Sequence, residues 1–356
     1  MHYFLRVLGI ISSLVFIISY PANAAHEKLI FALDLIRHGD RTPFDELPNA
    51  PHTWKEGKGQ LTALGMQQEY QLGLRLNQRY KLDNQLLPVN YQVNTVYIRS
   101  TDVDRTLMSA QSVLMGLYPL GTGPSLPDSN PALPSYFQPI PIHTIPAAQD
   151  TAFVIDTRSS DIAAVINKYV YSRADWQEKA AELEPQYLRW SQLTGVPIEN
   201  MLDVISVADT LNTYVIHNIP LPAGLSKEEA STIIENGNWI FATLFKSEQV
   251  GDVAGKAALT EIMKYIQQAV QHKTKTKFVL LSTHDVTILA VMSALHIPLD
   301  TAPPYASDLN FSVYQSESED YVVKITYNNK PVNVPGCMEN RCSLTQLLTY
   351  VGNQYK

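Results

Sequence analysis

The sequence has few charged residues, only two cysteines and, past residue 20, no long apolar run. Lys, Arg, Asp and Glu make up 17% of the chain and the net charge is −7, so we expect no nucleic-acid partner. A bilayer span needs about 20 apolar residues, which excludes a membrane span after residue 20. Two cysteines without nearby histidines cannot complete a tetrahedral zinc site, and no cluster of carboxylates suggests another metal. We therefore expect no metal and no other cofactor.

The first 24 residues have the pattern of a cleaved signal peptide. Arg6 supplies a short basic region, Val7 to Ile18 is apolar, and Ala22-Asn23-Ala24 is a small-x-small cleavage site. The sequence thus predicts a signal peptide at residues 1–24 and a mature chain that starts at Ala25. An uncleaved N-terminal anchor is the alternative, but its apolar core would be short.

Export makes a disulfide chemically feasible, and the two cysteines are close enough in sequence to close one small loop. They are Cys337 and Cys342, and the chain also has one glycosylation sequon, Asn310-Phe311-Ser312. Secreted eukaryotic enzymes of this size usually carry more cysteines and sequons. We therefore expect an exported protein, periplasmic or secreted, and favour a bacterial source.

The order of apolar patterns predicts an α/β protein with a helical insertion. The 356 residues are 45% hydrophobic, which is enough for more than one minimal domain. Eight prolines between residues 118 and 147 predict an irregular segment. Helical patterns then dominate residues 150–250, before strand patterns return. We expect an α/β core formed by residues 25–149 and 251–356, and an α-helical cap formed by residues 150–250.

The first strand pattern ends in an unusual cluster of charge. Lys28 to Ile36 is a nearly continuous apolar run that predicts a buried strand, and Arg37-His38-Gly39-Asp40-Arg41-Thr42-Pro43 follows it. Two guanidiniums disfavour protonation of the histidine and offer forked donors to an anion, and a neutral imidazole is a nucleophile. Gly39 would let the backbone approach a ligand closely. These residues predict a histidine nucleophile in a phosphate site; the alternative is a basic strand end with solvated side chains.

A second strand pattern, Val93 to Ile98, ends in Arg99-Ser100-Thr101-Asp102-Val103-Asp104-Arg105-Thr106, where a helix begins. We expect Thr101 or Asp102 to cap that helix. Arg99 would then lie at a strand end beside a helix N-terminus, which is a favourable place for anion binding. The other charged residues of the segment are assigned to capping or structural ion pairs: Asp102, Asp104 and Arg105.

A third buried strand is predicted at Phe278 to Ser282, followed by Thr283-His284-Asp285 and an apolar helix from Val286 to Leu295. A His-Asp pair alone is weak evidence for a site. Three strands that each end in this kind of residue are harder to explain by chance, because ligands of open α/β sheets bind at the carboxyl ends of the strands.

The three segments together resemble the histidine acid phosphatases, the branch of the histidine phosphatase superfamily that includes prostatic-type acid phosphatases and phytases. The resemblance rests on the Arg-His-Gly-x-Arg-x-Pro pattern at residues 37–43, the segment 99–106 and the His284-Asp285 pair. It runs from about residue 28 to residue 350 and is loose in the cap. It implies a phosphoglycerate mutase-like fold, in which a three-layer sandwich surrounds a mainly parallel sheet and carries an inserted helical cap.

The resemblance also implies a role for each site residue. His38 would be the phosphoryl acceptor and Asp285 the general acid that protonates the leaving alkoxide. The phosphate would be held by three arginines and one histidine: Arg37, Arg41, Arg99 and His284. The substrates would be small phosphate monoesters, hydrolysed at acidic pH without a cofactor. Prostatic-type members further suggest a Cys337–Cys342 disulfide and a homodimer, although the sequence locates no interface.

Three other functions compete with an acid phosphatase. A phytase shares all three motifs, but it needs a wide basic pocket, and it commonly has Thr-Asn where this chain has Val286-Thr287. A phosphate mutase would need phosphorylated intermediates to keep it primed, which an exported protein lacks. A non-catalytic phosphate-binding protein on the same scaffold would be expected to lack part of the site, whereas all expected residues are present.

Overall fold

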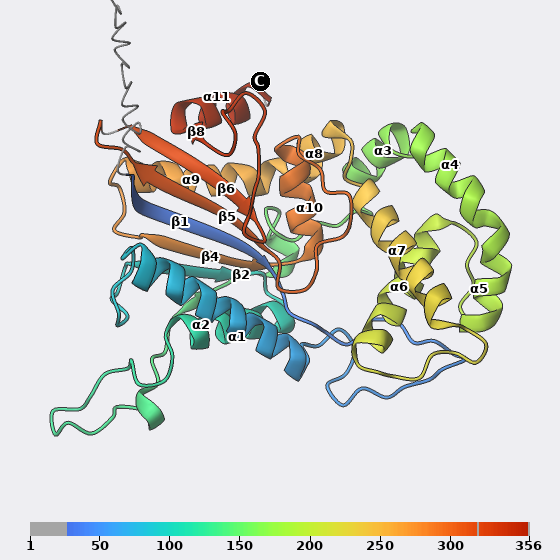
Figure 1. Cartoon of the computed structure of the whole chain (residues 1–356), viewed down its shortest axis with the longest axis horizontal. Helices are drawn as coiled ribbons and strands as arrows, with labels where there is room; N and C mark the ends of the chain where they lie inside the picture. The colour runs from blue at the N-terminus through green and yellow to red at the C-terminus, as the bar shows by residue number, and fades with distance from the viewer. Residues whose placement is uncertain (1–26, 319, 355–356) are drawn as a thin grey trace, which may run out of the picture.

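An eight-stranded sheet runs through the computed structural model, which describes residues 27–318 and 320–354 (Figure 1). The predicted signal peptide, residues 1–24, lies outside the described residues. The strand order is β3-β2-β4-β1-β5-β6-β7, and β8 pairs with β6. The strands are β1 (Lys28–Arg37), β2 (Val96–Ser100), β3 (Ile142–His143), β4 (Phe278–Thr283), β5 (Asp308–Gln315), β6 (Tyr321–Tyr327), β7 (Lys330–Pro331) and β8 (Cys342–Ser343).

The sheet is parallel on one side of β1 and antiparallel on the other. β3, β2, β4 and β1 run parallel, whereas β5 pairs with β1 in the opposite direction. The register places Arg37 beside Thr283, and Ser100 beside Ser282. The three predicted strand ends therefore meet at one edge of the sheet, which is the arrangement that the sequence motifs required.

Helices cover both faces of the sheet and make three layers. α1 (Ala63–Asn77) and α2 (Asp104–Leu117) pack on one face, and α9 (Lys256–Val270), α10 (Asp285–Ala294) and α11 (Leu344–Gln354) pack on the other (Figure 1). Leu33 and Leu35 of β1 point to the second face, whereas Ala32 and Ile36 point to the first. Because both faces are buried, β1 is apolar almost throughout. The predicted three-layer α/β fold is confirmed.

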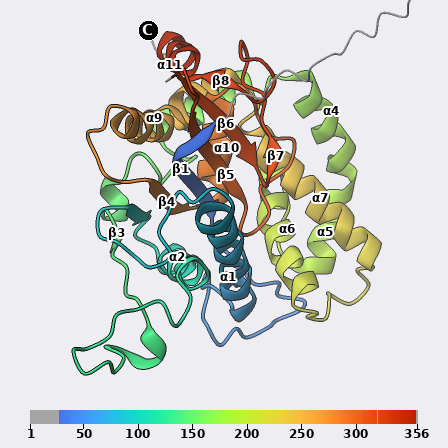
Figure 2. The same cartoon turned by 60° about the vertical axis from the view of Figure 1, so that its left-hand side comes forward.

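Residues 160–254 form a group of helices at the edge where the parallel strands end (Figures 1 and 2). They are α3 (Ser160–Tyr169), α4 (Ala174–Leu183), α5 (Tyr187–Thr194), α6 (Met201–Ile216), α7 (Lys227–Thr243) and α8 (Glu248–Ala254). They share an apolar core that includes Trp190, Leu211 and Tyr214. The helical content predicted for residues 150–250 is confirmed; the division into a core and a cap domain stays a prediction.

The remaining elements are short. Four single turns interrupt the longer elements: η1 (Gln78–Asp83), η2 (Pro134–Tyr136), η3 (Ala147–Gln149) and η4 (Glu184–Gln186). The first part of the proline-rich segment 118–147 extends away from the sheet (Figures 1 and 2), and the chain then returns to the sheet at β3. Cys337 and Cys342 form a disulfide, as the resemblance implied. No helix in the described part of the chain is both long and apolar enough to cross a bilayer.

The start of α2 differs from the prediction. Val103, not Thr101 or Asp102, occupies the N-cap position, and no side chain caps the helix. The Thr101 hydroxyl is used elsewhere, because it lies 2.8 Å from the Thr106 hydroxyl and 3.0 Å from Nε2 of His284. A tertiary contact with His284, which follows β4, therefore takes the side chain that local sequence assigned to the helix cap.

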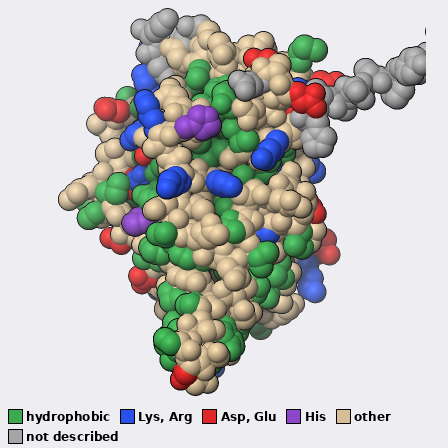
Figure 3. All heavy atoms as spheres, turned by 90° about the vertical axis from the view of Figure 1, so that its left-hand side faces the viewer, with side chains coloured by type: hydrophobic (Ala, Val, Ile, Leu, Met, Phe, Trp, Pro, Cys, Tyr) green, Lys and Arg blue, Asp and Glu red, His purple; other side chains and the backbone are tan. Residues whose placement is uncertain are grey.

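Charge is distributed unevenly between the two ends of the sheet. At the end that faces away from α3 to α7, basic, acidic and apolar side chains are intermixed on the surface (Figure 3). At the other end, the motif residues Arg37, His38, Arg41, Arg99 and His284 are buried. Burying a charge is costly unless it is paired, so this end of the sheet needs a specific explanation.

Candidate active site

His38 lies at the centre of the buried charged group, only 2% exposed. Its Nδ1 is 2.8 Å from the carbonyl oxygen of Gly39, which can only accept, so Nδ1 carries the proton and Nε2 keeps a free lone pair. Burial, followed by the positive charges of Arg105 and Arg37, holds the pKa of His38 well below its ordinary value. The imidazole is therefore neutral, and a nucleophile, even in acid.

Arg37 is fixed beside His38 by three contacts. Its Nη2 lies 2.7 Å from Oδ2 of Asp285, and its Nη1 donates to the carbonyl oxygen of Pro303. The guanidinium carbon stands 4.2 Å from the centre of the Tyr305 ring, close enough for a cation–π interaction. The first arginine of the motif is thus held in place by the residue predicted to be the general acid.

Arg41 forms a forked ion pair with Asp209 of α6, and both nitrogen–oxygen distances are 3.0 Å. Burial alone would lower the pKa of Arg41, but Asp209 outweighs it and raises the pKa above the ordinary value. The guanidinium also stacks over Phe44, 4.1 Å from the ring centre. Sequence reasoning missed Asp209, because nothing in its local pattern distinguishes it from any polar residue on a helix.

Arg99 lies outside this group, which corrects the prediction that it completes the phosphate site. β2 continues to Ser100, so Arg99 is not the last strand residue. Its Nη2 lies 2.7 Å from Oδ1 of Asp150, and its guanidinium carbon is 4.6 Å from the centre of the Phe153 ring. Arg99 pairs in register with Leu281, whose side chain packs in the core on the α9 face. The contacts of Arg99 are thus those of a structural ion pair.

Arg105 occupies the position that was assigned to Arg99. It lies in the first turn of α2, with Nη2 3.3 Å from Nδ1 of His284 and Nη1 3.4 Å from the carbonyl oxygen of Gly59. Burial and the neighbouring Arg41 lower the pKa of Arg105 to about 10, so it stays charged in acid. Within the described part of the chain it forms no ion pair with a carboxylate. The prediction that Arg105 is only a capping or ion-pair residue is therefore wrong.

His284 is neutral and engaged through both ring nitrogens. An arginine can only donate, so Nδ1 accepts from Arg105, and Nε2 therefore donates to the Thr101 hydroxyl, 3.0 Å away. Burial and then the charge of Arg105 lower the pKa of His284 to about 3. Its ring centre lies 5.6 Å from that of His38. The structure thus brings His284 to the site, as predicted, and Arg105 lies beside it.

Asp285 begins α10, and its Oδ1 accepts a hydrogen bond of 2.7 Å from the backbone nitrogen of Val286. Burial raises the pKa of this carboxyl, but the charges of Arg37 and Arg41 outweigh burial, and the pKa lies below the ordinary value. The Asp285 carboxyl is therefore ionised as long as no bound anion offsets the charges of Arg37 and Arg41. An anion bound to the same arginines would offset their effect and favour the protonated form.

Two further motif residues, Asp40 and Gly39, connect the end of β1 to the neighbouring helices. Asp40 is fully buried and lies 2.6 Å from Nε2 of His217, at the end of α6, and it also accepts from the Thr62 hydroxyl. A Cβ on Gly39 would stand 2.3 Å from the carbonyl oxygen of Gly65. Gly39 therefore serves close packing against α1, and its close approach to a ligand stays a prediction.

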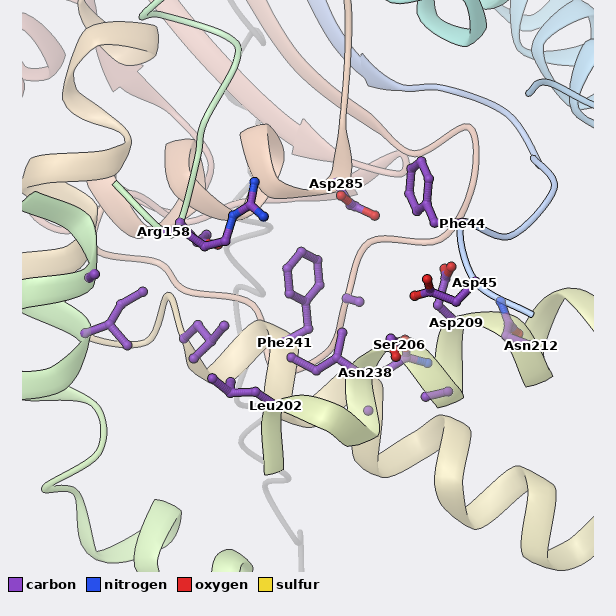
Figure 4. A pocket seen from close by; sticks show the side chains of 18 of the residues that line it. Phe44, Asp45, Arg158, Leu202, Ser206, Asp209, Asn212, Asn238, Phe241 and Asp285 are labelled. Atoms are coloured by element: carbon purple, nitrogen blue, oxygen red, sulfur yellow. The ribbon is translucent and has the colours of Figure 1, made fainter. Parts of the chain in front are cut away.

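A cavity of about 660 Å³ lies beside the arginines of the first motif (Figure 4). Arg37, Arg41 and Asp285 line one end, and most of the other lining residues belong to α3, α6 and α7. The ring of Phe241 projects into the space between Arg158 and Asp285 (Figure 4). We call Arg37, Arg41 and Arg105 the arginine cluster. Its three charges face two carboxylates, Asp209 and Asp285, so an anion is attracted to this end of the cavity.

Comparison with known proteins points to one family. The model of the histidine phosphatase superfamily, branch 2, matches residues 28–328. The chain is 30% identical over 357 residues to the prostatic acid phosphatase of Bos taurus, covering 97% of this chain and 90% of that protein. It is 32% identical over 337 residues to the lysosomal acid phosphatase of Bos taurus, covering 90% of this chain and 76% of that protein.

Among solved structures, the fold resembles that of a phytase from Klebsiella sp. ASR1. The TM-score is 0.71 at 16% sequence identity, over 93% of this chain and 97% of the phytase. At that identity the likeness concerns the fold alone. It agrees with the sheet order and the two helical layers described above.

Proposed function

The chain belongs to branch 2 of the histidine phosphatase superfamily, and we propose that it is an acid phosphatase that hydrolyses phosphate monoesters through a phosphohistidine. One observation carries the proposal: a neutral His38, with Nε2 free, lies beside three guanidiniums, two of which line one end of a cavity. A neutral nucleophile and a surplus of positive charge are what attack on a phosphate dianion requires.

In the first step, Nε2 of His38 attacks phosphorus as the ester oxygen leaves on the opposite side. The nitrogen–phosphorus bond forms and the phosphorus–oxygen ester bond breaks. The arginine cluster binds the equatorial oxygens, where most of the charge lies in the transition state. This assigns to Arg105 the role that the sequence assigned to Arg99, because Arg105 contacts His284 while Arg99 is bound to Asp150.

Asp285 supplies the proton to the leaving alkoxide. Its contact with Arg37 keeps it ionised in the free enzyme, and the negative charge of the bound phosphoryl group offsets that guanidinium. In the second step, the Asp285 carboxylate takes a proton from water as the water oxygen attacks phosphorus. The bond to His38 then breaks, and inorganic phosphate leaves. Dividing the reaction in this way replaces one difficult displacement with two easier ones.

The test is to trap the phosphoenzyme. Full-length protein mixed with phenyl phosphate and denatured in alkali should carry one phosphoryl group that is stable in base and labile in acid. His38→Ala should abolish it together with turnover. His143→Ala is the matched control, because His143 is exposed and stacks on Tyr97, 4.9 Å between ring centres. Near-normal turnover by His38→Ala would exclude this mechanism.

Phytase activity is the second candidate, favoured by the structural likeness to the Klebsiella enzyme. A hexaphosphate needs cations well beyond the site of the reacting phosphate. Apart from the arginine cluster, Arg158 is the only Lys or Arg among the described residues that line the cavity. Comparing the hydrolysis of phytate with that of simple monoesters, across pH and with a chelator present, would decide between the two.

Three further proposals accompany this function. The N-terminal pattern and the Cys337–Cys342 disulfide support export to the periplasm or the medium. We expect residues 25–149 and 251–356 to act as a catalytic core and residues 150–250 as a cap over the cavity. A homodimer remains a proposal by analogy with prostatic-type enzymes, to be tested by sedimentation.

A further inference from the structure

The cavity changes character with distance from His38. Beyond the arginine cluster its apolar wall is formed by residues of α3, α6 and α7 and by the residue that follows α7: Ala163, Ile166, Leu202, Ile205, Phe241 and Leu244. Neutral polar atoms are added by Thr157, Asn167, Ser206, Asn212 and Asn238. Arg158 adds the one further cation among the described residues there. A wall of this kind suits an uncharged, mainly apolar leaving group.

A second cavity of about 590 Å³ lies next to the first. Tyr171 and Leu202 line both cavities, so these two side chains form the boundary between them. Its lining combines apolar or aromatic side chains, among them Trp176, Tyr187 and Met201, with polar ones such as Gln177 and Asn200. No Lys or Arg of the described chain lines it, whereas Glu184 and Glu199 do, so a second phosphate group would be repelled there.

Leu202 marks the path between the two cavities. It is the second residue of α6 and is 41% exposed, whereas Met201 and Val204 of the same helix are buried. An apolar chain lying across it would remove that exposed surface from water, which favours binding in proportion to the area covered. The two cavities, of about 660 and 590 Å³, offer more space than a short ester such as a glycerol phosphate fills.

We propose that the two cavities form one subsite for the alcohol portion of the substrate, and that the preferred substrates are monophosphates of elongated apolar alcohols, such as long alkyl chains. The inference rests on the proposed phosphatase function. The phosphate lies in the arginine cluster, the ester oxygen lies near Asp285, and the chain passes Phe241 and Leu202 towards Trp176.

The experiment is a series of ethyl, butyl, octyl and dodecyl monophosphates, assayed for phosphate release below their micelle concentrations. Burial of the chain predicts that kcat/KM rises by up to about fourfold for each added methylene until the subsite is filled. The rise should come mainly from KM, because the chain is bound equally in the ground state and the transition state. A kcat/KM that does not depend on chain length would overturn the inference.

Two variants test the location of the subsite. Leu202→Asp should lower the ratio of dodecyl to ethyl phosphate activity by about tenfold or more, because a carboxylate would face the chain. Leu188→Asp is the matched control, since Leu188 is 71% exposed on α5 and lines neither cavity, and its ratio should equal that of the wild type. An unchanged ratio in Leu202→Asp would overturn the inference.

The two levels of the proposal fail differently. If the wild type releases no phosphate from ethyl or phenyl phosphate, the proposed function fails and the inference falls with it. If it hydrolyses those esters but prefers phytate or shows no chain-length effect, the phosphatase function stands and only the apolar subsite is rejected. A rising series together with a loss in Leu202→Asp supports both.

Discussion

The two ends of the cavity are built on different physical principles. At the inner end, Arg37 and Arg41 are at most 7% exposed and each is bound by a carboxylate of the protein. At the outer end, Leu202 is 41% exposed and the walls are apolar. Folding thus fixes the charges that act on phosphorus in advance, whereas the outer end gains its contacts only when a substrate covers it. Reaction and selectivity can therefore be altered separately.

The largest effect is expected at Asp285, the proposed general acid of the inner end. Asp285→Asn cannot donate a proton to the alkoxide and should slow hydrolysis of alkyl phosphates by roughly 10²- to 10⁴-fold. The loss should be much smaller for nitrophenyl phosphate, because nitrophenolate leaves without protonation. Steady-state rates with the two esters measure this. An equal loss for both leaving groups would reject the acid role.

The next largest effect is expected at Arg105, and it distinguishes this residue from Arg99 in the same segment. Arg105→Ala removes a donor from the transition state and should lower kcat/KM by roughly 10²- to 10³-fold. Arg99→Ala should change kcat/KM little but should destabilise the fold by about 3–5 kcal/mol, because it leaves the Asp150 carboxylate buried and unpaired. Kinetics and urea unfolding of both variants make the comparison. A larger kinetic loss in Arg99→Ala would restore the role that the sequence suggested.

A smaller effect is expected at Asp209, the carboxylate that forms an ion pair with Arg41. Asp209→Asn weakens the ion pair with Arg41 and removes a negative charge beside the arginine cluster, so inorganic phosphate should inhibit at roughly tenfold lower concentration. Asp45→Asn is the control, because Asp45 lines the same cavity but has no ion pair with Arg41. Equal effects of the two variants would mean that only net charge matters.

The smallest effect concerns a buried carboxyl pair away from the cavity. Burial raises the pKa of Asp308, and nearby Asp34 raises it further; Asp34 itself accepts from the Tyr80 hydroxyl at 2.6 Å and from Asn310 at 3.0 Å. Below the unfolded value of about 3.9 the proton is bound in both states, so the stability that this group contributes is fully present there. Above that pH the unfolded chain releases this proton while the folded protein keeps it. The free energy of unfolding therefore falls as the pH rises, until the pH reaches the pKa of Asp308 in the folded protein.

Asp308→Asn keeps a donor towards Asp34 but does not titrate. The wild type should lose up to about 1.4 kcal/mol of unfolding free energy per pH unit more than the variant over that interval. Urea unfolding at several pH values gives the difference directly. Parallel pH profiles of wild type and variant would show that Asp308 does not hold the proton.

The sequence was informative wherever function and local pattern coincide. β1 and β4 were predicted closely because strands buried on both faces leave a continuous apolar run, and His38, Arg37 and Asp285 stand at the ends of such runs. The family resemblance and the comparisons agree on the superfamily. Local pattern failed at Arg99 and Arg105, which lie six residues apart in the same segment.

The structure decided between those two arginines through the direction of their side chains. β2 runs through Arg99 to Ser100, so the register with Leu281 turns the side chain of Arg99 towards Asp150. Arg105 lies in the first turn of α2, and from there its Nη2 lies 3.3 Å from Nδ1 of His284. No spacing rule separates these outcomes, since both depend on where a strand ends in three dimensions.

The sequence by itself determined the α/β core and placed His38 and Asp285 at the ends of buried strands, because these features follow from residue type and from the periodicity of burial. Their roles as nucleophile and acid stay proposals. Only the tertiary structure decided which arginine completes the inner end, that Asp209 and His217 reach it from α6, and that the outer end is apolar. Those features depend on contacts between residues more than 150 positions apart, or on which face of a helix meets the cavity, and neither is encoded locally.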